Sequence, residues 1–107
     1  MNTPDIDAAD MQSHAEQAAA LLKSLAHPAR LRVLCHLVDG EASVSELQAQ
    51  VALSMSALSQ HLALMRDAGL VSTRREAQTI YYALADSPAL GVMHALYEAY
   101  CGKGKRR

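Results

Sequence analysis

Residues 54–65 read Ser54-Met55-Ser56-Ala57-Leu58-Ser59-Gln60-His61-Leu62-Ala63-Leu64-Met65 and contain two interleaved sets of side chains. Leu58, Leu62 and Met65 recur at three- and four-residue steps, which is the period of a helix with one buried stripe. The other face carries short or amide-bearing uncharged groups that can exchange hydrogen bonds with base edges in the DNA major groove. Its members are Ser56, Ala57, Ser59, Gln60 and His61. The stretch therefore predicts a helix that reads DNA.

A second helix is predicted immediately upstream. Ser43-Val44-Ser45-Glu46 has the Ser-x-x-Glu form of a capping box, which marks the start of a helix. We expect this short helix to run from Val44 to Val51 and to be followed by a tight turn through Ala52 and Leu53. Two helices joined in this way, the second with a polar outer face, predict a helix-turn-helix.

The residues downstream predict a β-hairpin. Gly69 is a helix terminator, residues 70–75 alternate loosely, residues 76–78 form a turn, and residues 79–84 are rich in strand formers. The hairpin is expected to be tipped with Arg74 and Arg75. A basic hairpin directly after a recognition helix is typical of a wing that touches phosphate or the minor groove.

Three further helices are expected. The first begins at Asp10, after a flexible lead-in over residues 1–9, and its stripe of small apolar residues could pack on a second subunit or on its own core. The second begins at His27-Pro28 and ends at Asp39-Gly40. The last is opened by Asp86-Ser87-Pro88, ends near Cys101-Gly102 and is followed by a basic tail over residues 102–107. The apolar faces predicted for the three are Met11, Ala15, Ala18, Ala19, Leu22 and Leu25; Leu31, Leu34, Cys35 and Val38; and Leu90, Met93, Leu96, Tyr97 and Tyr100.

The predicted fold is thus mainly α with a small β-hairpin: a single winged helix-turn-helix domain over residues 1–107, with five helices and a two-stranded wing. At 107 residues and 50% hydrophobic content the chain can bury a core. No apolar run approaches the roughly 20 residues that span a bilayer, and the N-terminus lacks a signal-peptide pattern. We expect a cytoplasmic protein without membrane contact.

The net charge of −1 does not favour binding to nucleic acid, but the charges are unevenly distributed. Acidic residues gather near the N-terminus, whereas basic residues gather in the wing and the tail. The acidic group is Asp5, Asp7, Asp10 and Glu16, and the basic residues of the tail are Lys103, Lys105, Arg106 and Arg107.

Three separated motifs resemble the ArsR/SmtB family of bacterial regulators. They are residues 22–34, which include Ala26-His27-Pro28-Ala29-Arg30; residues 54–70, which include Ser59-Gln60-His61-Leu62; and residues 74–82. The resemblance covers about residues 15–101. It implies a dimeric winged helix-turn-helix repressor whose first and last helices form the dimer interface. It also implies an inducer that weakens binding to operator DNA.

The DNA contacts expected from these motifs lie on the recognition helix and on the wing. Ser54, Ser56, Ala57, Ser59, Gln60 and His61 are expected to face a pseudo-palindromic duplex, and Arg74, Arg75, Gln78 and Thr79 are expected to contact its backbone or minor groove.

The sequence departs from both metal-binding patterns of the family. Residues 44–48 contain no thiol where some members have Cys-x-Cys, and the last helix lacks two of the imidazoles that other members use. His94, Glu98 and Cys101 still share one helical face. We expect no metal and no cofactor, with a metal-responsive repressor as the alternative.

Cys35 and Cys101 are the candidate sensor. By pattern alone each is a small buried hydrophobe. However, Leu34-Cys35-His36-Leu37 and Tyr100-Cys101 resemble the two cysteine motifs of the family branch that senses persulfides and oxidants. This resemblance implies a dithiol switch in which reactive sulfur species or an oxidant link the two cysteines and release the DNA. Whether the product is a disulfide or a longer sulfur chain stays open.

The sequence contains no arrangement typical of a catalytic centre. Ser59 and His61 point to different faces of a helix, and the two cysteines lack the Cys-x-x-Cys spacing of a catalytic dithiol, so no enzyme is predicted. An anti-repressor, which activates transcription by displacing another DNA-binding protein, is the second alternative.

Overall fold

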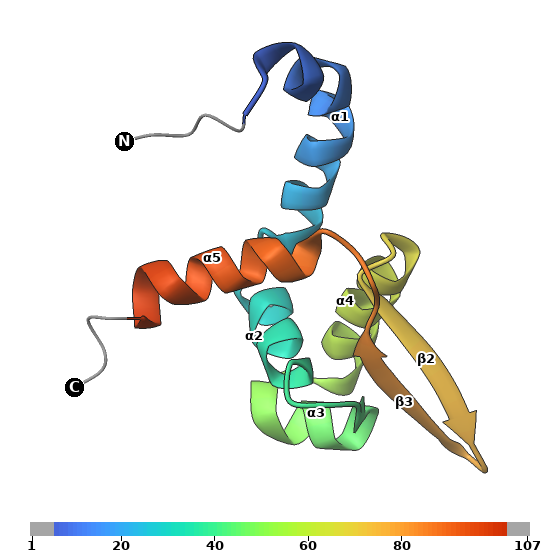
Figure 1. The fold of residues 1–107 in the computed structure, drawn as a ribbon. Coiled ribbons are helices and arrows are strands. Elements are labelled where there is room, and N and C mark those ends of the chain that lie inside the picture. The colour runs from blue at the N-terminus through green and yellow to red at the C-terminus, as the bar shows by residue number, and fades with distance from the viewer. Residues whose placement is uncertain (1–5, 103–107) are drawn as a thin grey trace.

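The computed structural model describes residues 6–102, which form five helices and a three-stranded antiparallel sheet (Figure 1). Residues 1–5 of the predicted lead-in and residues 103–107 of the predicted basic tail lie outside the described residues. The helices are α1 (Ala8–Leu25), α2 (Pro28–Leu37), α3 (Val44–Val51), α4 (Met55–Asp67) and α5 (Ala89–Cys101), and the strands are β1 (Ala42–Ser43), β2 (Val71–Glu76) and β3 (Thr79–Leu84).

The core lies where α2, α3 and α4 meet the sheet. Leu34, Leu47, Leu58, Leu62 and Met65 are almost completely buried there. Burying an aliphatic side chain of this size contributes about 1.5 to 3 kcal/mol relative to leaving it in water. The predicted buried stripe of residues 54–65 is therefore confirmed, and it fixes which face of α4 remains outside.

Local capping signals explain where most of these helices begin and end. Pro28 occupies the first turn of α2, and the Ser43 hydroxyl and the Glu46 side chain form the capping box of α3, as predicted. After α4 the chain closes in a Schellman motif: the Leu70 N–H donates to Met65 O and the Gly69 N–H to Arg66 O. Gly69 has a φ of 77°, which suits glycine.

The sheet differs from the predicted two-stranded wing by one short strand. β1 pairs with β3, so that β3 is central and the order is β1-β3-β2. A two-residue strand is too short to produce an alternating sequence pattern, and for this reason it was not predicted. The wing also turns later than expected: Glu76 belongs to β2, and the turn consists of Ala77 and Gln78.

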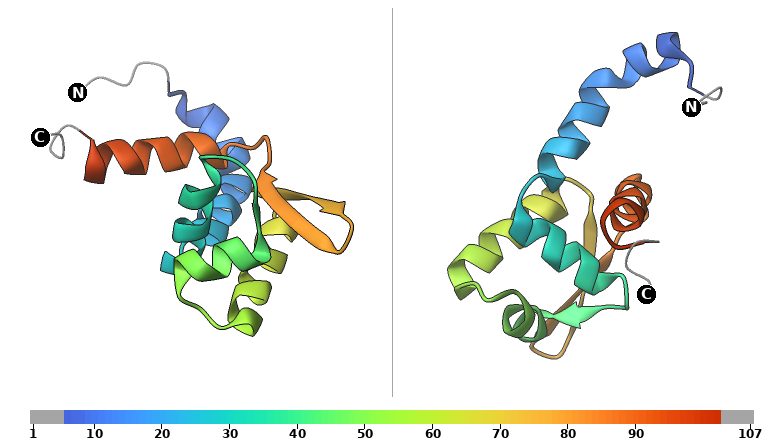
Figure 2. Two further views of the ribbon diagram at one scale, coloured as in Figure 1. Left: turned by 90° about the horizontal axis from the view of Figure 1, so that it is seen from below. Right: turned by 90° about the vertical axis from the view of Figure 1, so that its left-hand side faces the viewer.

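Two of the predicted apolar faces are mostly exposed in a single chain. α1 buries only Ser24 and Leu25, and α5 buries only Ala89 and Met93. Figures 1 and 2 show both helices projecting from the body formed by α2, α3, α4 and the sheet. α1 also begins at Ala8, before the predicted start at Asp10, because the Asp7 carboxylate accepts the N–H groups of Ala9 and Asp10.

The buried face of α2 was predicted only in part, since Leu34 is buried as expected but Cys35 and Val38 are not. The structure buries Ala29, Val33, Leu34 and Leu37, whereas Cys35 and Val38 are exposed. The helix has apolar residues on more than one face, so periodicity alone could not select the face that packs on α3 and α4.

Candidate nucleic-acid interface and cysteine pair

The turn between α3 and α4 sets the recognition helix at a fixed angle. Ala52 has a φ of 53° in the left-handed region, and the Gln48 side-chain amide donates to Leu53 O at 3.1 Å across the turn. The Ser54 hydroxyl then caps α4 by accepting the Ala57 N–H at 3.1 Å. These contacts position α4 without using the side chains on its outer face.

The outer face of α4 carries part of the predicted DNA-contacting set. Ser56, Ser59 and Gln60 are exposed, so their hydroxyl and amide groups are available to a partner. Ser54 is exposed but serves as the N-cap, and Ala57 is half-buried. The structure therefore brings three of the predicted polar side chains together on one open helical face.

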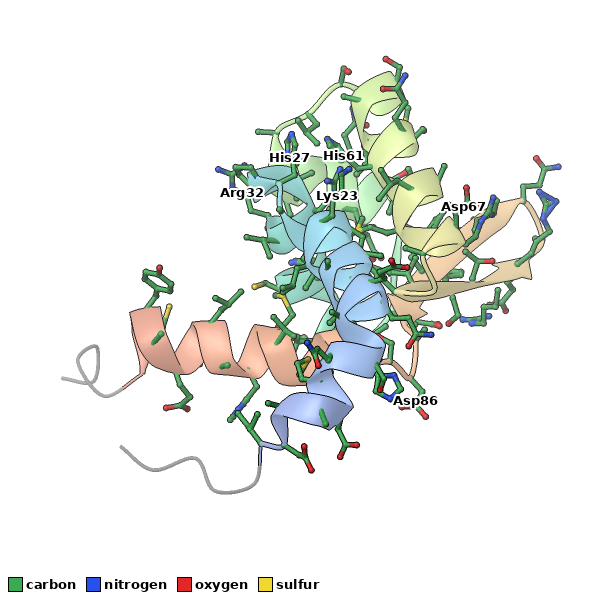
Figure 3. The ribbon with its side chains drawn as sticks, turned by 90° about the horizontal axis from the view of Figure 1, so that it is seen from above. Lys23, His27, Arg32, His61, Asp67 and Asp86 are labelled. Carbon is green, nitrogen blue, oxygen red and sulfur yellow. The ribbon has the colours of Figure 1, made fainter. Side chains whose placement is uncertain are left out.

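His61 points away from that face. Its Nδ1 lies 3.2 Å from Nη1 of Arg30, and its ring centroid lies 4.4 Å from that of His27. Figure 3 shows the two imidazoles side by side, between the start of α2 and α4. Because a guanidinium can only donate, Nδ1 of His61 must accept in this contact. The sequence prediction placed His61 among the outward polar groups, whereas the structure places it in an interhelical contact.

The surroundings of His61 disfavour its charged form. Burial lowers its pKa, and the positive charges of His27 and Arg30 lower it further. Arg30 is held in place from the other side, since its Nε donates to Ser24 O at 2.7 Å. This cluster joins the C-terminal end of α1 and the N-terminal end of α2 to the recognition helix.

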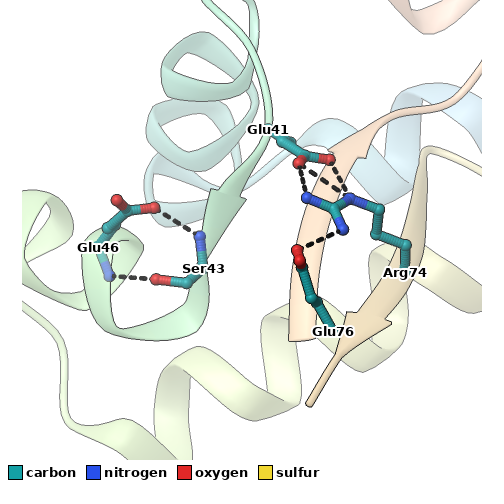
Figure 4. A network of polar contacts seen from close by, with 5 residues as sticks. All are labelled: Glu41, Ser43, Glu46, Arg74 and Glu76. Carbon is teal, nitrogen blue, oxygen red and sulfur yellow. Dashed lines mark hydrogen bonds and ion pairs between the residues drawn. The ribbon is translucent and has the colours of Figure 1, made fainter. Parts of the chain in front are cut away.

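The hairpin presents an exposed end beyond the helices. Arg75, Gln78 and Thr79 are exposed near the turn, and Ala77 adopts a φ of 57° within it. The predicted tip at Arg74 and Arg75 is wrong, because both residues lie within β2. Arg74 is instead engaged by two carboxylates, those of Glu41 and Glu76 (Figure 4). Nothing in the sequence pattern pairs Glu41 with a residue of the wing.

Both cysteines are free thiols, and each lies near the surface of a single chain. Cys35 is exposed and Cys101 is half-buried, so the expectation of a buried Cys35 is wrong for this chain alone. The pKa of Cys35 is raised, first by partial burial and then by the negative charge of Cys101. Arg32 is not among the causes of this shift, although it lines the same groove as Cys35. The two thiols are therefore near enough to interact electrostatically.

The residual metal-binding constellation is loose. Nε2 of His94 lies 4.0 Å from a Glu98 carboxylate oxygen, and both side chains are largely exposed. Within residues 6–102, no group of three or more His, Cys, Asp or Glu side chains is arranged to hold a metal ion. No helix in this part of the chain is both long and apolar enough to cross a membrane.

A capped helix-turn-helix with an open polar face, followed by a β-hairpin with an exposed end, defines a winged helix-turn-helix DNA-binding protein. Residues 27–73 match the family described as bacterial regulatory protein, arsR family. The chain is 41% identical over 103 residues to a biofilm growth-associated repressor of Xylella fastidiosa, covering 96% of this chain and 90% of the relative. It is 46% identical over 92 residues to the transcriptional activator HlyU of Vibrio cholerae, covering 86% of this chain and 85% of that protein.

The structure agrees with these similarities. The crystal structure of the transcriptional repressor BigR from Xylella fastidiosa superposes with a TM-score of 0.84 at 42% identity, covering 90% of this chain and 98% of that one. The chain belongs to the arsR family of bacterial regulatory proteins. It is a DNA-binding transcriptional regulator and not an enzyme.

Proposed function

We propose that this regulator is a cytoplasmic homodimer that binds operator DNA when Cys35 and Cys101 are reduced and releases it when they are linked. The observation that carries the proposal is the placement of the only two thiols of the chain on α2 and α5, close enough for the charge of Cys101 to raise the pKa of Cys35. One lies on the helix that packs against α3 and α4, and the other on a helix that projects from the body. A bond between them couples these two parts.

The proposed DNA contacts follow from exposure. Ser56, Ser59 and Gln60 face the base edges, Ser54 and Ala57 lie at the start of α4 near the phosphates, and Arg75, Gln78 and Thr79 contact the backbone or minor groove. His61 contributes indirectly, by holding the recognition helix through its contacts with Arg30 and His27. Arg74 is not included in this set of direct contacts.

The proposed dimer uses the exposed apolar faces of α1 and α5. Leu90, Tyr97 and Tyr100 are 52%, 58% and 82% exposed, and on α1 Met11 and Leu22 are also more than half exposed. Large apolar side chains grouped on projecting helices favour a protein partner. A second copy is the partner that a palindromic operator requires, since the symmetry of such an operator matches a twofold dimer.

The switching chemistry balances with an organic persulfide, R–S–SH, as the oxidant. Because burial and the charge of Cys101 raise the pKa of Cys35, we assign the first attack to Cys101, whose sulfur takes the terminal sulfur of the persulfide and releases R–SH. Cys35 then attacks the Cys101 sulfur and expels hydrosulfide. The net change converts two thiols and R–S–SH into a disulfide, R–SH and hydrogen sulfide. Further sulfur from a second persulfide gives a longer bridge, which a Cα separation above about 7 Å would require.

The link changes DNA affinity through geometry. The two recognition helices of a dimer must meet half-sites about 34 to 36 Å apart, or a multiple of that spacing. Tying α2 to α5 within each chain alters how the body sits on the dimerising helix. The bound and released forms then differ in the spacing of their recognition helices, which is the coupling that an inducer needs.

The test uses fluorescence anisotropy with promoter DNA, together with intact-protein mass spectrometry, before and after treatment with an organic persulfide. Wild type is expected to lose two hydrogens, or to gain bridging sulfur, and to release DNA. Cys35→Ser and Cys101→Ser are expected to bind DNA normally, to form no internal link and to stay bound. Release of the double-Ser variant at the wild-type dose would place the sensor elsewhere.

A second function, activation by displacement of another DNA-binding protein, has one observation in its favour. The relative from Vibrio cholerae is named an activator, whereas the relative from Xylella fastidiosa is named a repressor. In vitro transcription with purified polymerase distinguishes the two roles. A repressor lowers transcript yield from its promoter, whereas an anti-repressor raises yield only when the displaced protein is present.

A further inference from the structure

Arg74 is held by three groups at once. Its Nε donates to both carboxylate oxygens of Glu41 at 3.0 Å, its Nη2 donates to the same carboxylate, and its Nη1 donates to Glu76 at 2.9 Å. The guanidinium carbon also lies 4.6 Å from the centre of the Tyr81 ring. The planar guanidinium suits this bidentate contact, which a lysine ammonium could not reproduce.

The contact crosses the central strand of the sheet. Tyr81 of β3 pairs with Arg74 of β2 on one side and with Ser43 of β1 on the other. Arg74 therefore reaches over Tyr81 to Glu41, in the segment that leads into β1. Ser43 caps α3 through the capping box, so the wing is joined through Glu41 and β1 to the helix-turn-helix (Figure 4).

The charges of this cluster oppose a phosphate contact. The hydrogen bond from Arg74 lowers the pKa of Glu41, and both carboxylates raise the pKa of Arg74, so the guanidinium and Glu41 are charged at neutral pH. One guanidinium with two carboxylates has a net charge of −1. A phosphate near Arg74 would therefore meet a locally negative group.

Arg75 lies on the other face of the sheet. Side chains alternate along a strand, and Arg75 pairs with Ile80 on the face that also holds Tyr82, whereas Arg74 pairs with Tyr81 on the opposite face. Tyr82 is buried and belongs to the core cluster, so the face of Arg75 is the one turned toward the helices. Arg75 is exposed near the end of the hairpin.

We propose that Arg74 and Glu41 are positioning residues that hold the wing at its angle to the helix-turn-helix, and that Arg75 supplies the phosphate contact of the wing. Arg74 contributes to DNA binding through the placement of the hairpin and not through its own charge.

The salt dependence of operator binding separates the two roles. A lost phosphate contact reduces the slope of log K against log salt by about 0.9, whereas a misplaced wing lowers affinity without that specific change. We expect Arg75→Ala to reduce the slope by this amount. Arg74→Ala and Glu41→Gln are expected to weaken binding about two- to fivefold, in line with an exposed ion-pair network, at an unchanged slope. The double variant should be no weaker than either single variant, because both remove the same contact.

Arg74→Lys provides the conservative comparison. Lysine keeps the charge but not the bidentate geometry, so it should bind DNA as weakly as Arg74→Ala if Arg74 is a positioning residue. Amide hydrogen exchange of β2 and β3 in the free protein should be faster in Arg74→Ala and Glu41→Gln than in wild type or Arg75→Ala. The proposal is overturned if Arg74→Ala reduces the salt slope, if Arg74→Lys retains wild-type affinity, or if Glu41→Gln binds DNA as tightly as wild type or more tightly.

Discussion

The imidazole rings of His27 and His61 lie with their centroids 4.4 Å apart and their planes inclined at 54°. Both rings act as hydrogen-bond acceptors: Nδ1 of His27 accepts the Ala29 N–H at 3.0 Å, and Nδ1 of His61 accepts from Arg30. Each contact needs an unprotonated nitrogen. The N-cap of α2 and the inner side of the recognition helix are therefore joined through two imidazole rings whose Nδ1 atoms accept hydrogen bonds.

This pair predicts that acid destabilises the fold. Because the pKa of His61 is lowered in the folded state, the unfolded chain binds the proton more tightly, and falling pH favours unfolding. The contribution of His61 is complete above its ordinary pKa of about 6.5 and is lost as the pH falls below it. We expect urea midpoints to decrease from pH 7.5 to 5.5, and His61→Asn to flatten part of that decrease.

His14 provides a matched control, since it is exposed on α1 and contacts only Gln17 among the described residues. His14→Asn should retain the wild-type pH dependence. Identical pH profiles for His61→Asn and wild type would contradict the role of His61.

Replacement of Gln60 tests the recognition face. Gln60→Ala should weaken operator binding by about 1 to 3 kcal/mol and relax the preference for one base pair, because a bidentate amide contact to a base edge is lost. Competition binding against single-base operator variants measures both effects. Gln50→Ala, at an exposed amide on α3 outside this face, should leave affinity unchanged; if the two variants behave alike, Gln60 does not read a base.

A charge on α5 tests the proposed dimer. Tyr97→Glu places a carboxylate where an apolar side chain is 58% exposed, and burial of that charge in an interface would be costly. We expect the mass from sedimentation equilibrium to fall toward the 11.5 kDa of one chain and operator affinity to fall with it. Ala49→Glu on α3 serves as the control and should stay dimeric. A dimeric Tyr97→Glu protein would exclude this part of α5 from the interface.

A truncation in the core tests the packing of α4. Leu62 is 1% exposed, and Leu62→Ala should lower the free energy of unfolding by about 2 to 5 kcal/mol through lost burial and the cavity that it leaves. Leu64 is 41% exposed on the same helix, so Leu64→Ala should cost less than about 1 kcal/mol. Urea denaturation measures both. Equal losses would mean that Leu64 is covered in solution.

The sequence predicted the elements that local chemistry determines. The capping box at Ser43, Pro28 at the start of α2 and Gly69 after α4 are short-range signals, and the helices they border lie close to where the sequence places them. The period of Leu58, Leu62 and Met65 selected the buried face of α4, because the opposite side of that helix is polar.

Features that depend on tertiary contacts were missed. His61 lies on the border between the polar and apolar sides of α4, and its position is set by Arg30, which is 31 residues away in the sequence. From the sequence, Arg74 is expected to be an unpaired basic residue of the wing, because its partner Glu41 precedes it by 33 residues. Cys35 and Leu34 are adjacent apolar residues of α2, but α3 and α4 cover the face that holds Leu34 and leave Cys35 exposed. Pairing between distant side chains has no local sequence signature.

The small buried surface of α1 has a consequence for the stability of the proposed dimer. A helix of 18 residues that buries only Ser24 and Leu25 gains little from packing on its own chain, although such packing supplies most helical stability in proteins. If a second copy covers α1 and α5 as proposed, ordering of these helices and association are a single equilibrium. The thermal midpoint should then rise with protein concentration. At a low concentration of the regulator, the same equilibrium would limit both the folded fraction of α1 and the occupancy of the operator. The rate at which the regulator is synthesised would then set the concentration at which it begins to act.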